Sequence, residues 1–192
     1  MLAADTTAAL TGAIELFLGR PSGLKRFDLS FEGFWRSFAA LLYILPFFAI
    51  VVAADWMTLS QQPDAPALTT LAVARLFDVG LDFGAMPVVL ALLARRLGIQ
   101  RSYIGYVIVR NWSTLVIVVP QAVISLLFGL GIVSMEASEL MSLVVVGVML
   151  FYQYRIARWT LGWNGTQAAG LVAADLGLSL ILLFFVHGLF GI

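Results

Sequence analysis

The segment ARLFDVGLDF, residues 74–83, carries the side chains best suited to chemistry in this chain, namely Arg75, Asp78 and Asp82. Their spacing places all three along one face of an α-helix. A guanidinium and two carboxylates on one face can form ion pairs, pass protons or bind a cation. The neighbouring residues are apolar, and each charge near the centre of a membrane-spanning helix costs about 2.5–3.5 kcal/mol on insertion. The charged face is therefore expected to point into a helical bundle or a water-filled cavity.

Three further polar residues lie in other apolar segments. Arg110 and Asn111 belong to the third segment and Asp175 to the fifth. With a rise of about 1.5 Å per residue, Arg110 and Asp175 each lie roughly 10–12 Å from the same membrane boundary. This depth predicts an ion pair between the two helices, and Asp82 is close enough to the midplane to share Arg110. Together the six residues form a candidate intramembrane polar network, either structural or part of an ion or proton pathway.

The charges within the apolar segments do not balance, because two arginines face three aspartates. One carboxylate is then protonated, bound to a small cation, or reached by a flanking basic residue such as Arg36 or Arg155. We assign the unpaired carboxylate to Asp82. If Asp82 is protonated, its replacement by asparagine is expected to be nearly neutral for folding.

The elements that position these side chains follow from composition. Of 192 residues, 61% are hydrophobic and 11% are charged, which lies far outside the range of soluble domains. The apolar residues come in runs of about 20, the length that crosses a hydrocarbon core of about 30 Å. The sequence therefore predicts an all-α fold, a polytopic membrane helical bundle.

About five transmembrane helices are expected in a transmembrane domain that occupies residues 31–192. Their approximate ranges are 34–54, 68–93, 103–133, 140–156 and 167–190. Residues 1–30 form a cytoplasmic N-terminal segment, in which Leu10, Ile14 and Phe17 recur at helical spacing. This segment is too short and too mixed to span, so it predicts an amphipathic helix at the membrane interface.

Basic residues predict the orientation. They precede the first span, lie between the second and third, and follow the fourth: Arg20, Lys25, Arg26, Arg36, Arg95, Arg96, Arg101, Arg155 and Arg158. The charged residues expected in the loops on the other side are all acidic, namely Asp55, Asp64, Glu136 and Glu139. The positive-inside rule then predicts a bacterial inner-membrane protein with a cytoplasmic N-terminus and a periplasmic C-terminus.

Several classes of function are disfavoured. Eleven basic and eleven acidic residues leave no net charge, so nothing indicates a nucleic-acid partner. There is no cysteine, and no nucleophile–base pair, metal-ligand cluster, phosphate-binding loop or dinucleotide fingerprint is found. We therefore expect no enzymatic activity, catalytic residue, metal or cofactor. The lone histidine, His187, is interpreted as an interfacial or packed residue.

Three segments resemble the Yip-type (Rab-interacting) membrane-protein superfamily and its uncharacterised bacterial relatives. They are FDLSFEGFWRSF, VIVRNW and TQAAGLVAADLGLSL, starting at Phe27, Val107 and Thr166. The resemblance implies a cytoplasmic N-terminal segment ahead of five compact spans, with an interaction role rather than a reaction. The sizeable polar N-terminal region of eukaryotic members is largely missing here.

Two functions remain open. The first is an accessory, assembly or membrane-organising component, whose Arg/Asp network fixes helix packing or docks a partner. Its partners would be the lipid bilayer and other membrane-protein subunits, or a second copy of the chain. The alternative is a small oligomeric proton- or cation-coupled transporter or channel that uses Asp82, Asp78 and Asp175.

Overall fold

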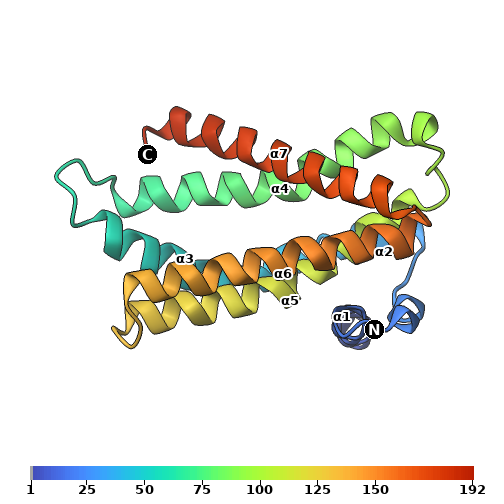
Figure 1. The fold of residues 1–192 in the computed structure, drawn as a ribbon, viewed down its shortest axis with the longest axis horizontal. Coiled ribbons are helices and arrows are strands. Elements are labelled where there is room, and N and C mark those ends of the chain that lie inside the picture. Colours follow the sequence, from blue (N-terminus) through green and yellow to red (C-terminus); the bar gives the residue numbers. More distant parts are fainter. Residues whose placement is uncertain (1) are drawn as a thin grey trace.

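The computed structural model describes residues 2–192, and every regular element in that range is helical (Figure 1). In chain order the elements are α1 (Leu2–Phe17), the 3-10 helix η1 (Pro21–Arg26), α2 (Phe31–Ser37), α3 (Ala40–Leu59), α4 (Leu68–Leu97), α5 (Tyr103–Gly129), α6 (Met135–Leu161) and α7 (Gly165–Phe190). Five stretches are long and apolar enough to cross a membrane, the first of them formed by α2 and α3 together. The predicted all-α, multi-pass helical bundle is confirmed.

Local signals define most helix ends. Ser134 and Asn164 accept hydrogen bonds from backbone N–H groups in the first turns of α6 and α7, which is the usual role of an N-cap. Gly98 and Gly162 end α4 and α6 with φ angles of 69° and 67°, a left-handed conformation that glycine adopts without a steric penalty. These caps make both of the turns α4–α5 and α6–α7 short.

Helices α3, α4, α6 and α7 extend beyond their predicted ranges, α3 and α6 most of all, whereas α5 ends at Gly129 instead of residue 133. Helix α3 continues to Leu59, so that Asp55, which we expected in a loop, lies inside the helix. Asp55 can lie inside the helix because its carboxylate is paired with Arg75 of α4. Helix α6 begins at Met135 rather than near residue 140, because the polar residues before the apolar run form its capped first turn.

The long helices run roughly along one direction, with α4 and α7 on one side of the bundle and α3, α5 and α6 on the other (Figure 1). Helix α5 is central, because it packs against α1, α2, α3, α4 and α6. The α4–α5 and α6–α7 turns lie at one end of the bundle, and the α3–α4 and α5–α6 loops lie at the other together with the C-terminus. Helix α1 crosses the long helices near the first of these ends.

The buried core is concentrated toward the end of the bundle where α1 lies. All residues of α5 from Tyr106 to Ser113 are buried, because α5 is surrounded there on several sides. Farther along the bundle many large apolar side chains are exposed, including Leu143, Val144, Ile181, Phe184 and Phe185. An apolar surface of this kind is suited to contact with lipid.

Candidate functional site

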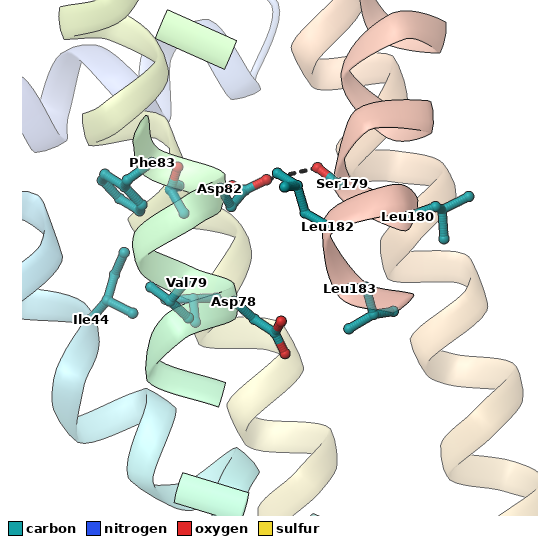
Figure 2. A pocket seen from close by; sticks show the side chains of 11 residues that line it. Ile44, Asp78, Val79, Asp82, Phe83, Ser179, Leu180, Leu182 and Leu183 are labelled. Carbon is teal, nitrogen blue, oxygen red and sulfur yellow. Dashed lines mark hydrogen bonds between the residues drawn. The ribbon is translucent and has the colours of Figure 1, made fainter. Parts of the chain in front are cut away.

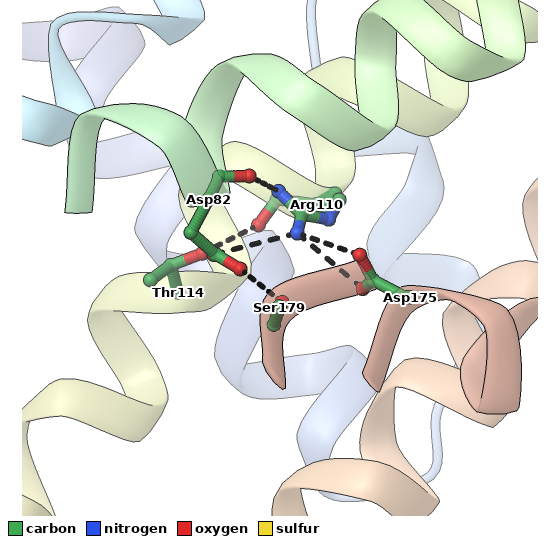
Figure 3. A network of polar contacts seen from close by, with 5 residues as sticks. All are labelled: Asp82, Arg110, Thr114, Asp175 and Ser179. Carbon is green, nitrogen blue, oxygen red and sulfur yellow. Dashed lines mark hydrogen bonds and ion pairs between the residues drawn. The ribbon is translucent and has the colours of Figure 1, made fainter. Parts of the chain in front are cut away.

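Arg110 is the centre of an ion-pair cluster that joins three helices (Figure 3). Its Nη2 lies 3.3 Å from both carboxylate oxygens of Asp175 on α7 and 3.4 Å from Oδ2 of Asp82 on α4. Its Nη1 donates to the backbone carbonyl of Asp82 at 3.1 Å. The side chains of Arg110 and Asp175 are only 4% and 8% exposed. We call Asp82, Arg110 and Asp175 the inner cluster, and it ties α5 to both α4 and α7.

Two hydroxyl groups complete the inner cluster. Ser179 of α7 donates to Oδ1 of Asp82 at 2.9 Å, so each carboxylate oxygen of Asp82 has a partner. Thr114 donates to the backbone carbonyl of Arg110, one helical turn away. Asp82 is therefore not the carboxylate without an internal cation, and that assignment was wrong. The packing of α4 brings Asp82 to the same level as Arg110, which Asp82 shares with Asp175.

A second cluster lies toward the end of the bundle where the C-terminus is found. Nη2 of Arg75 is 2.9 Å from Asp55 on α3, and Nη1 is 3.6 Å from Asp78 one turn along α4. Nε2 of His187 on α7 lies 3.3 Å from Nη1 of Arg75 and 3.8 Å from Asp78. These four residues are called the outer cluster. It joins α3, α4 and α7.

Sequence reasoning missed two members of the outer cluster. Asp55 was placed in a loop, although its position directly after an apolar run was a signal that α3 could continue through it. His187 was interpreted as an interfacial or packed residue, and only the docking of α7 on α4 brings it next to Asp78. The predicted charged face of α4 is thus divided, with Arg75 and Asp78 in the outer cluster and Asp82 in the inner one.

Each cluster holds two carboxylates and one guanidinium. In the outer cluster, both oxygens of Asp78 and Nε of Arg75 are buried without a hydrogen-bond partner among residues 2–192. Asp78 and Asp82 lie about one helical turn apart on α4. Both line one cavity of about 330 Å³, together with Thr114 and residues of α3 and α7 (Figure 2). The two clusters are therefore connected through this central cavity.

Two other cavities adjoin the clusters. One of about 380 Å³ lies between α5, α6 and α7, and we call it the α6–α7 groove. Its polar lining consists of Asp82, Arg110, Thr114, Gln121, Gln153, Asp175 and Ser179. The other, of about 290 Å³, is the outer pocket, and its lining includes Asp55, Arg75, Gln121, Glu139 and Ser142. Gln121 lines both, so polar groups continue from the outer pocket to the inner cluster.

Asn111 belongs to neither cluster, although we expected it in the same network. Its fully buried side chain donates from Nδ2 to Oγ of Ser37 at 2.9 Å, and Ser37 in turn donates to the carbonyl of Phe34. Asn111 follows Arg110 in sequence, and successive residues of a helix point in different directions. Its role is to bind α5 to α2.

The N-terminal segment is docked on the bundle by polar contacts. The hydroxyl of Tyr152 on α6 lies 2.7 Å from the carbonyl of Ala13 and 2.9 Å from the hydroxyl of Ser113. Arg155 donates to the carbonyl of Phe17 at the end of α1 and stacks over Trp159 at 4.5 Å. Helix α1 is thus part of the folded core, in which its Ala13 and Leu16 are fully buried.

The two flanking arginines that were candidates to reach the unpaired carboxylate, Arg36 and Arg155, have other partners. Arg36 pairs with Asp5 of α1 and with Asp28. Hydrogen bonds from Ser30, together with the charge of Arg36, hold the pKa of Asp28 below its ordinary value. Arg155 contacts α1 as described above, so neither arginine reaches the carboxylates inside the bundle.

Within residues 2–192 no group of three or more histidine, cysteine or acidic side chains is arranged to hold a metal ion. Comparison of the chain with protein-family models, with curated proteins and with solved structures finds no match in any of the three. The candidate site is therefore defined by its geometry. It consists of two ion-pair clusters among α3, α4, α5 and α7, and polar cavities join the clusters.

Proposed function

We propose that this chain is a non-catalytic component of a membrane-protein assembly, and that the α6–α7 groove receives a transmembrane helix of a partner. The observation that carries this proposal is the side chain of Gln153, which lines a groove between two membrane-spanning helices and has no hydrogen-bond partner among the described residues. In a bilayer, polar groups need partners within protein, because lipid tails offer no hydrogen bonds.

Gln153 illustrates the need for a partner. It lines the α6–α7 groove, and among the described residues it makes no hydrogen bond, whereas Gln121 donates to Ser142. The remaining lining is largely apolar and includes Val146, Met149 and Leu176. A helix that carries a polar side chain among apolar ones would satisfy Gln153 and cover this lining at the same time.

The ion-pair clusters support an assembly role in a second way. Both arginines are engaged with carboxylates of this same chain, so the charges hold the helices at a defined register. Polar contacts inside membranes contribute only about 0.6–2 kcal/mol each, but they specify geometry. The clusters thereby present the α6–α7 groove as a preformed surface.

The orientation that we propose is that of a bacterial inner-membrane protein with a cytoplasmic N-terminus and a periplasmic C-terminus. The basic residues that led to this prediction belong to the segments at the end of the bundle where α1 lies. The exposed apolar side chains of Ile14 and Phe17 on α1, and of Leu18 directly after it, are suited to rest on the membrane surface there. The resemblance to the Yip-type superfamily, with its interaction role, is compatible with this proposal and stays a prediction.

Cysteine cross-linking in the native membrane tests the partner. The chain has no cysteine, so Val146→Cys introduces a single reactive thiol into the α6–α7 groove. A membrane-permeable thiol-to-amine or thiol-to-thiol cross-linker is expected to trap a covalent adduct of higher mass, because a docked helix would lie against residue 146. Mass spectrometry of the adduct identifies a different subunit or a second copy of the chain.

Val144→Cys is the matched control. It lies two residues away on α6, about 200° around the helix, does not line the groove, and is 66% exposed. The adduct is expected from position 146 and not from position 144. Equal yields from both positions, or no adduct from either, would contradict docking in the groove.

A second candidate function is a proton- or cation-coupled carrier that works as an oligomer. It is favoured by the excess of carboxylates, since each cluster pairs two of them with one arginine and polar cavities connect the clusters. An unbalanced negative charge at membrane depth favours uptake of a proton or a cation.

Asp82→Asn tests the carrier. The asparagine retains an oxygen that can accept from Ser179 and leaves Arg110 paired one-to-one with Asp175, so the fold is expected to survive. If the protein is a carrier, purified wild-type protein in liposomes conducts protons or monovalent cations, and the variant loses this flux. Wild-type liposomes as tight as empty ones would exclude the carrier and leave the assembly role.

A further inference from the structure

A separate groove lies between the C-terminal half of α4 and the N-terminal half of α7. It encloses about 420 Å³ and shares no lining residue with the α6–α7 groove. Figure 1 shows the two helices spreading apart toward the α4–α5 turn. The α4–α7 groove is lined by Met86, Val89, Leu90, Leu93, Arg96, Leu97, Trp163, Gln167, Gly170, Leu171 and Ala174.

The polar residues of this groove are gathered at one end. Its depth is apolar, with Met86, Leu90 and Leu171 nearly buried at its floor. Arg96 is its one charged lining residue, and no carboxylate of residues 2–192 lies within ion-pair distance of it. Gln167 and Trp163 lie near the α6–α7 turn, at the same end of the bundle. The groove thus has a cationic, polar mouth and an apolar interior.

The length of the groove matches one leaflet of a bilayer. From Arg96 to Met86 the chain advances ten residues along α4, which corresponds to about 15 Å. Half of a hydrocarbon core is also about 15 Å. Tryptophan prefers the boundary between headgroups and hydrocarbon, so Trp163 places the mouth at that boundary.

We propose that the α4–α7 groove binds an anionic phospholipid, with an acyl chain along Met86–Leu93 and the phosphate group at Arg96. The order of polar mouth and apolar depth is the order of headgroup and tail in a lipid. The unpaired guanidinium supplies the charge complementarity, because it offers paired N–H donors to phosphate oxygens. Nearby Arg95 adds positive charge that favours an anionic headgroup over a zwitterionic one.

Gly170 allows the groove to be filled without disturbing the fold. A Cβ atom at this position would meet no atom within 4 Å, so a side chain there projects into the open groove. Leucine is also a better helix former than glycine, so Gly170→Leu is expected to fold. Gly147→Leu on α6 is the matched control, because its Cβ likewise meets nothing and residue 147 does not line the groove.

The headgroup contact is tested separately with Arg96→Gln. Its control is Arg101→Gln, which removes an exposed arginine from the same turn but outside the groove. Each protein is purified in mild detergent, stripped of lipid, and titrated with phosphatidylglycerol or phosphatidylcholine. Binding is followed by native mass spectrometry and by the shift in melting temperature.

Wild type and both controls are expected to bind one phosphatidylglycerol more tightly than phosphatidylcholine. Gly170→Leu is expected to lose this binding, and Arg96→Gln to weaken phosphatidylglycerol binding about tenfold, as for loss of one charge-assisted hydrogen bond. Retention of binding in Gly170→Leu, no preference between the lipids in wild type, or an equal effect of Arg101→Gln would overturn the proposal. A protein found bound in the α4–α7 groove in place of lipid would overturn the proposal as well.

Discussion

Replacing Arg110 with methionine is expected to destabilise the folded protein by about 3–5 kcal/mol, the cost of removing one partner from a buried ion pair. Methionine fills a comparable volume but leaves the carboxylates of Asp82 and Asp175 facing each other without a cation. It also removes the donor to the backbone carbonyl of Asp82. Because Arg110 links α5 to α4 and α7, the loss acts on three helices at once.

The measurement is the melting temperature in detergent, followed by circular dichroism or by size-exclusion chromatography after heating. A decrease of about 6–20 °C is expected for a chain of this size. Arg101→Met is the control, because Arg101 is exposed and outside both clusters, and its melting temperature is expected to stay close to that of wild type.

A triple variant separates electrostatics from packing. Adding Asp82→Asn and Asp175→Asn to Arg110→Met removes the unpaired charges, so most of the lost stability is expected to return. A single variant that melts like wild type would show that the inner cluster does not hold the bundle. A triple variant no better than the single one would assign the loss to packing instead.

Replacing Gly23 with leucine is expected to release η1 from α1 within the N-terminal segment. A Cβ atom at position 23 would lie 2.6 Å from the carbonyl oxygen of Gly12, and one at position 12 would lie 2.8 Å from the carbonyl oxygen of Gly23. The two glycines therefore allow the backbones of α1 and η1 to touch. Because a backbone carbonyl cannot move aside as a side chain can, the substitution costs about 1–3 kcal/mol or more.

Limited proteolysis measures this release. Trypsin cleaves after Arg20, Lys25 and Arg26, which lie in or beside η1, and the cleavage rate is expected to rise in Gly23→Leu. Gly147→Leu is again the control, since its side chain meets no neighbour, and it should be cleaved like wild type. Unchanged protection in Gly23→Leu would mean that the close approach of α1 and η1 is not required to keep η1 in place.

Part of the candidate site could be predicted from the sequence. The depth of Arg110 and Asp175 below the same boundary was enough to predict their pairing, and the structure brings them together at 3.3 Å. The depth of a residue below the membrane boundary can be calculated from the sequence, because a helix rises by a constant amount per residue. The possibility that Asp82 shares Arg110 followed from the same reasoning, whereas the choice of Asp82 as the unpaired carboxylate did not survive.

The rest of the site depended on contacts between distant segments. Asp55 lies within helix α3, and its carboxylate contacts Arg75, which follows twenty residues later in the chain. His187 joins the outer cluster only through the packing of α7 on α4. Asn111 turns away from Arg110 toward Ser37, a partner that lies 74 residues earlier. No local pattern specifies such neighbours.

The sequence by itself determined that this chain is helical and has five apolar helices, because hydropathy and helix caps are properties of adjacent residues. It also determined which face of α4 is charged, since helical periodicity requires only one helix. Only the tertiary structure decided which carboxylate meets which arginine, how α1 docks, and where the grooves open. Those features depend on the rotation and relative height of packed helices, which side chains far apart in sequence set together.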